Sequence, residues 1–140
     1  KGQPPAELAG SKVPENVDLR NRLIGDEEAV GLFSRCALVV LPYIEASQSA
    51  LVAAAYFFGK PVVVSRVGAL PEYVVEGVTG WVVPPGDQRS LADALATALG
   101  EPARLAQGAE YRQTMAAVQC PSQRAVQRGR VQAGLRARQS

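Results

Sequence analysis

A glutamate that follows a buried apolar run is the first residue of this sequence that could do chemistry. Glu45 comes after residues 36–41 (CALVVL) and opens a segment of small and polar residues, namely Ala46, Ser47, Gln48 and Ser49. Free backbone N–H groups at the start of a helix bind anions such as a diphosphate, and the polar side chains add donors. A carboxylate beside such a turn would repel the phosphates themselves. Its natural partners are therefore neutral hydroxyl groups or a developing positive charge. The alternative, favoured by composition alone, is that Glu45 and Ser47 only cap the helix.

A second segment of the same kind follows the next apolar run, residues 61–65 (PVVVS). It consists of Gly68, Ala69, Leu70, Pro71 and Glu72. Gly68 permits a close backbone approach, and Pro71 suits the first position of a helix whose N–H groups would face the same cleft as Glu45. The alternative is a plain connection in which Glu72 is a first-turn acid.

Other kinds of chemistry are excluded by what the 140 residues lack. Histidine is absent, which removes Ser-His-Asp and Cys-His catalysis and His-ligated metals. The two cysteines, Cys36 and Cys120, lie 84 positions apart, so neither a disulfide framework nor a zinc cluster is indicated. No acidic cluster has metal-ligand spacing and no glycine-rich phosphate loop is present, so we expect no metal.

Eight elements must position these residues. We expect strands at residues 16–23, 36–41, 61–65 and 81–83, and helices at 26–34, 48–58 and 89–99 with a short one opened by Pro71. Tyr56, Phe57 and Phe58 are predicted to be core residues. Alternating strands and helices with short links favour an α/β, Rossmann-like parallel sheet with helices on both faces, in which ligands sit at the carboxyl ends of the strands. Here those ends are residues 42–48 and 65–72.

With these residues in place, residues 13–106 resemble the C-terminal, donor-binding domain of family 4 glycosyltransferases of the GT-B fold. The resemblance rests on EASQS, GKPVV, GALPE and GVTGWVVPPGD in this order and spacing. It implies an incomplete C-terminal half of a GT-B fold. The implied activity is retaining transfer of a sugar from a nucleotide-sugar, a UDP- or GDP-sugar, without an essential metal or other cofactor.

The resemblance also implies roles for residues. Glu45 matches the first of two family glutamates and would contact the donor sugar near the reacting centre. The second, which holds the nucleotide ribose, would fall at Ala53 or Ala54, so the pair is broken in this sequence. The remaining donor-binding residues would be Ala46, Ser47, Gln48, Ser49, Gly68, Ala69, Leu70 and Glu72.

The domain prediction has three parts: an irregular leader over 1–12, the partial nucleotide-sugar-binding domain over 13–106, and an Arg-, Gln- and Ala-rich helix or tail over 107–140. Residues 1–100 hold 8 basic and 11 acidic side chains, whereas 101–140 hold 7 and 2. The tail has no aromatic interleaving, so nucleic acid is not an expected partner. The tail departs from the family pattern, and the chain has 12 arginines against 3 lysines. Two interpretations of the tail stay open: a frame-shifted read-through of the gene, and a divergent arginine-rich helix.

The resemblance further places the acceptor on an N-terminal domain that this sequence does not contain. We therefore expect a glycosyltransferase fragment without activity by itself. The competing hypothesis is a non-catalytic Rossmann-like binding or assembly module, or an inactive truncated homologue. A sugar-nucleotide epimerase would need histidine and acidic residues that the chain lacks. The longest apolar run is too short to span a membrane. The expected location is cytoplasmic, with peripheral association at the inner membrane face for a full-length parent.

Overall fold

The computed structural model describes residues 12–105 and 107. The chain divides into two compact units, residues 1–32 and residues 33–140. The predicted leader, except for Lys12, and the predicted tail, except for residue 107, lie outside the described residues. No helix in the described part is both long enough and apolar enough to cross a membrane.

The first unit corrects one prediction, because residues 16–23 form no strand. Val17 and Leu19 are each 50% exposed. An alternating run becomes a strand only where it pairs with a neighbouring strand, and no strand among the described residues pairs with this one. The Val17 N–H instead donates to the Pro14 carbonyl oxygen at 3.0 Å. Instead the guanidinium groups of Arg20 and Arg22 bond the Glu28 carboxylate at 2.6 Å and 2.7 Å. These contacts lower the pKa of Glu28, the bond from Arg22 most. Glu28 lies in the acidic first turn of helix α1 (Asp26–Arg35).

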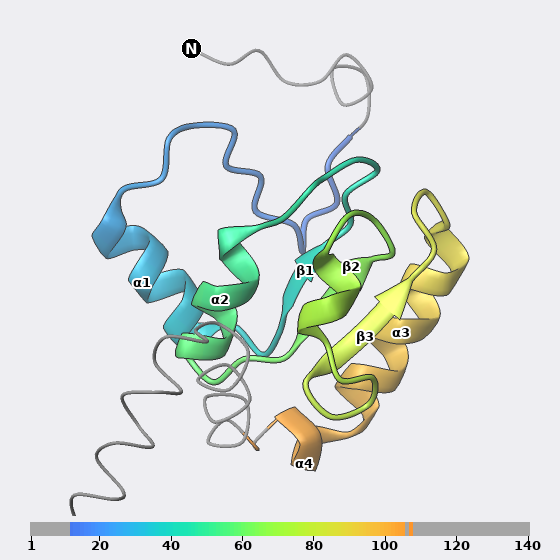
Figure 1. Ribbon diagram of the computed structural model, residues 1–140. Helices are drawn as coiled ribbons and strands as arrows, with labels where there is room; N and C mark the ends of the chain where they lie inside the picture. Colours follow the sequence, from blue (N-terminus) through green and yellow to red (C-terminus); the bar gives the residue numbers. More distant parts are fainter. Residues whose placement is uncertain (1–11, 106, 108–140) are drawn as a thin grey trace, which may run out of the picture. The chain divides into compact units, whose positions relative to one another are not determined.

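The second unit contains a parallel sheet of three strands in the order β1-β2-β3 (Figure 1). The strands are β1 (Val39–Leu41), β2 (Val62–Ser65) and β3 (Gly80–Val83). In register, Val40 lies opposite Val63, and Val63 lies opposite Trp81. The apolar runs therefore form parallel strands as predicted, although β1 begins three residues later than its run.

Helices cover both faces of this sheet (Figure 1). Side chains alternate along β2, so Val62 and Val64 join the cluster that contains α2 (Ala50–Phe57), whereas Val63 joins the cluster that contains α3 (Gln88–Gly100). All three valines are fully buried. The predicted α/β, Rossmann-like sheet flanked by helices is confirmed. A short helix α4 (Pro102–Leu105) follows α3.

The aromatic run in α2 shows how helix geometry divides neighbouring residues. Tyr56 is fully buried, and its hydroxyl lies 3.0 Å from the Tyr73 carbonyl oxygen and 2.9 Å from Thr79 Oγ1. Phe57 is 72% exposed, so its prediction as a core residue is wrong. Consecutive helical residues point about 100° apart. Phe58 is half-buried and stacks on Phe33 with ring centroids 5.5 Å apart.

The ends of α2 bring the chain back to the sheet. Phe58 is the C-cap of α2, and Gly59 follows it with a φ of 68°. This left-handed conformation favours glycine and turns the chain toward β2. After β2, a single 3₁₀ turn, η1 (Leu70–Tyr73), has Pro71 at its start as predicted.

Candidate functional site

The two segments predicted to bind a donor meet at the carboxyl ends of β1 and β2. The backbone N–H of Ala69 donates a hydrogen bond to the Ser47 carbonyl oxygen at 2.9 Å. Gly68 has a φ of 51°, and a Cβ atom there would stand 2.1 Å from the Ala46 carbonyl oxygen and 2.6 Å from that of Ser47. Only glycine fits this approach, so the two segments form one surface, which we call the joined loops (residues 45–49 and 68–72).

Glu45 stands exposed on the joined loops. Among the described residues its carboxylate has no hydrogen-bond or ion-pair partner, which leaves both oxygens available to a ligand. The alternative in which Glu45 and Ser47 cap α2 is wrong. The N-cap is Ser49, whose Oγ accepts the Leu51 N–H at 3.2 Å and lies 3.4 Å from the Tyr43 hydroxyl.

The other predicted residues fall into two groups by exposure. Ser47, Gln48, Gly68 and Glu72 are exposed, and Ala46, Ser49 and Ala69 are half-buried. The Leu70 side chain is fully buried in the core, so it fixes the loop, and only its backbone could contact a ligand. Ala53 and Ala54, where the resemblance places a second glutamate, are half-buried on α2.

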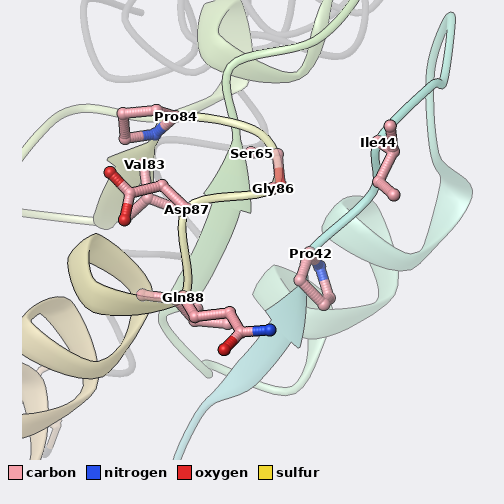
Figure 2. A pocket seen from close by; sticks show the side chains of 9 residues that line it. Pro42, Ile44, Ser65, Val83, Pro84, Gly86, Asp87 and Gln88 are labelled. Atoms are coloured by element: carbon pink, nitrogen blue, oxygen red, sulfur yellow. The ribbon is translucent and has the colours of Figure 1, made fainter.

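A hollow of about 280 Å³ lies at the carboxyl ends of all three strands (Figure 2). Its apolar wall combines the loop after β1 with the end of β3 and the first turns of α3. Its lining residues are Pro42, Ile44, Ser65, Val83, Pro84, Gly86, Asp87, Gln88 and Leu91. Ile44 directly precedes Glu45 in the chain, so one loop contributes to both the hollow and the joined loops.

Asp87 closes the start of α3 beside this hollow. Its carboxylate accepts the Ser90 N–H at 3.0 Å and the Ser90 hydroxyl at 2.7 Å. The backbone bond from Ser90 and then its hydroxyl bond lower the pKa of Asp87, so the group is anionic at neutral pH. Asp87 is therefore the N-cap of α3.

Sequence reasoning missed the hollow because it followed the ends of only two strands. Ser65 lies within the predicted strand end over residues 65–72, but Asp87 and Gln88 follow β3. The rule that ligands gather at strand ends applies to this third strand as well. It also passed over Arg66, an exposed cation two residues before Gly68. In the described residues, no group of three or more acidic or cysteine side chains is arranged to hold a metal ion.

Comparisons with known proteins agree with this geometry. The model of the family of group 1 glycosyl transferases matches residues 1–101, and the chain belongs to this family. It is similar to D-inositol 3-phosphate glycosyltransferases of two corynebacteria. The protein of Corynebacterium efficiens is 36% identical over 88 residues, which is 61% of this chain and 21% of that protein. The protein of Corynebacterium glutamicum is 36% identical over 74 residues, which is 53% of this chain and 18% of that protein.

Two solved structures share the fold. Sucrose-phosphate synthase from Thermosynechococcus elongatus aligns with a TM-score of 0.62 and 31% identity, covering 80% of this chain and 29% of that one. HepE from Anabaena, in complex with UDP-glucose, aligns with a TM-score of 0.57 and 25% identity, covering 61% of this chain and 24% of that one. The described sheet is thus part of a glycosyltransferase domain, and the chain spans about a fifth of the length of the corynebacterial relatives.

Proposed function

We propose that the chain forms the donor-binding part of a retaining glycosyltransferase of the family 4 type, which takes its sugar from a nucleotide-sugar. The observation that carries the proposal is the joining of residues 45–49 to 68–72 by the Ala69 to Ser47 hydrogen bond. It sets an exposed carboxylate and the start of a helix at the carboxyl edge of a parallel sheet, where such sheets bind nucleotides. The UDP and UDP-glucose complexes of HepE support a uridine nucleotide as the first candidate.

The roles follow from the exposure of each group. Glu45 contacts the donor sugar near the reacting centre, where an unpartnered carboxylate can accept sugar hydroxyls or stabilise developing positive charge. Ser47, Gln48 and Ser49 offer donors to the diphosphate or the sugar. Glu72 and the backbone of residues 68–70 line the opposite side. Ala53 and Ala54 supply no carboxylate to the ribose, so ribose recognition falls to other groups.

The acceptor belongs to a part of the full-length protein outside this sequence, and the chain by itself is expected to transfer no sugar. A full-length parent would act in the cytoplasm, associated peripherally with the inner face of the membrane. Mass spectrometry of the chain incubated with UDP- and GDP-sugars and candidate acceptors tests the inactivity, because any glycosylated product would contradict it.

Nucleotide binding is the direct test of the donor site. We expect UDP or GDP to bind the chain with a dissociation constant of about 1 mM or below in calorimetry. UDP-glucose should bind more tightly than UDP if the sugar contacts Glu45. Glu45→Gln should then weaken UDP-glucose binding about tenfold and leave UDP binding unchanged. A hydrogen bond to a charged group is worth about 1–1.5 kcal/mol more than one to a neutral group.

Two variants act as controls. Gln48→Ala removes an exposed donor from the joined loops and should weaken both ligands. Asp93→Asn changes an equally exposed carboxylate in the middle of α3 and should weaken neither. If neither nucleotide binds, or if Asp93→Asn matters as much as Glu45→Gln, the donor site is refuted. The non-catalytic module is then the better description of the chain.

A further inference from the structure

The hollow at the start of α3 contains a buried hydroxyl that has no hydrogen-bond partner among the described residues. Ser65 ends β2 and is 2% exposed. Its hydroxyl makes no hydrogen bond to another described residue, yet no buried side-chain oxygen or nitrogen in the described part is left unsatisfied. The Ser65 oxygen therefore keeps some exposed surface, and Ser65 is one of the residues that line the hollow. Figure 2 shows the side chain turned into it.

The rest of the wall defines what chemistry would meet this hydroxyl. The Gln88 side chain extends into the hollow and carries both a donor and an acceptor (Figure 2). Pro42, Ile44 and Val83 are among the residues that offer C–H surface around these polar groups. The C–H surface can pack against the face of a saturated ring, and the polar groups can bond hydroxyl groups on the edge of that ring. The volume of about 280 Å³ lies at the lower limit for ligand pockets and suits a single small ring.

Charge at the hollow selects against anions. Among the described residues that line it there is no lysine or arginine, and Asp87 is the one charged side chain. The Asp87 carboxylate caps α3, and the bonds from Ser90 keep it ionised. A helix start would otherwise attract phosphate, but a fixed carboxylate at the N-cap offsets that attraction. A neutral ligand is therefore favoured over a phosphorylated group at this position.

We propose that the hollow lined by Ser65, Gln88 and Asp87 binds a neutral cyclic polyol, with the Ser65 hydroxyl and the Gln88 amide bonding its hydroxyl groups. Binding of the polyol stands on the hollow itself. It does not depend on the donor site, although Ile44 lines the hollow and directly precedes Glu45 in the chain.

The test uses myo-inositol and D-glucose as probes on the full chain, without nucleotide. In ¹H–¹⁵N spectra both should shift the amide signals of Ser65, Gly86 and Gln88, with a dissociation constant of about 1–10 mM. Ser65→Ala and Gln88→Ala should each weaken binding about threefold to tenfold, the effect of one neutral hydrogen bond. Arg89→Ala, on the same turn but outside the lining, should leave the affinity unchanged.

Three results would overturn the proposal. The first is that neither polyol shifts these amide signals. The second is that both variants bind the polyols as tightly as the unmodified chain does. The third is that inorganic phosphate shifts the same amide signals and binds as tightly as the polyols. Gln88 is exposed, so Gln88→Ala remains informative even if Ser65→Ala fails to fold. The polyol titration contains no nucleotide, so it is independent of the donor site. If the chain binds the polyols but neither UDP nor GDP, the hollow is confirmed as a polyol site and the proposed donor site is refuted.

Discussion

Replacing Gly68 by alanine should separate the joined loops. The new Cβ would stand 2.1 Å from the Ala46 carbonyl oxygen, 2.6 Å from the Ser47 oxygen and 2.9 Å from the Ser47 carbonyl carbon. All three are backbone atoms, so no side-chain rotation relieves the overlap. The loop must retreat, and the 2.9 Å hydrogen bond from Ala69 to Ser47 is lost.

The size of the effect follows from three contributions. A left-handed φ costs a non-glycine residue about 1–2 kcal/mol. Overpacking against fixed atoms costs about 1–3 kcal/mol. A lost hydrogen bond costs about 0.5–1.5 kcal/mol. Together these lower the free energy of unfolding of Gly68→Ala by about 2.5–6.5 kcal/mol, a large part of the stability of a small domain.

Gly86→Ala is the matched control, because Gly86 has a left-handed φ like Gly68 but does not lie against the backbone of another segment. Gly86 has a φ of 71°, and a Cβ there would meet nothing within 4 Å. It should lose only about 1–2 kcal/mol. Urea unfolding followed by the emission of the single tryptophan, the buried Trp81, measures both variants. Equal losses would refute the reasoning, because the loops would then separate without cost.

Three further predictions use the same unfolding assay. Tyr56→Phe should lower the free energy of unfolding by about 1–3 kcal/mol, because the buried Thr79 hydroxyl loses its 2.9 Å partner; an unchanged midpoint would contradict this. Gly80→Ala should destabilise more than Gly25→Ala, because its Cβ would stand 2.1 Å from a carbonyl oxygen of β2, whereas a Cβ at Gly25 would meet nothing. The lowered pKa of Asp87 predicts stabilisation above its unfolded pKa, near 3.9, that is lost as the pH falls through the lower folded value. Asp87→Asn keeps a capping side chain but removes this step, so its stability difference from the unmodified chain should shrink in acid; a constant difference would argue against the linkage.

Local sequence predicted most of the sheet and the edge of the sheet at which the candidate site lies. Residues 36–41 and 61–65 are apolar throughout, and such runs suit parallel strands buried on both faces. Glu45 and Gly68 could be picked out because they follow those runs, and the order of EASQS, GALPE and GVTGWVVPPGD indicated the family that the family model confirms. These signals are short-range, so they are readable without knowledge of which segments touch.

Other features depended on which segments touch. The alternation at Val17 and Leu19 predicts a strand, yet residues 16–23 form none, because a strand needs a neighbour that the pattern does not specify. Composition likewise placed Phe57 in the core, whereas the rotation of α2 leaves it 72% exposed.

The chemistry at the edge of the sheet divides in the same way. The sequence by itself determined that a carboxylate and small polar residues follow β1, and that glycine follows β2. Only the tertiary structure decided that Gly68 packs against the backbone at Ser47, and that Ser65 and Gln88 line one hollow. Both arrangements join residues more than twenty positions apart, and such contacts are fixed by the register of β1, β2 and β3 rather than by any local pattern.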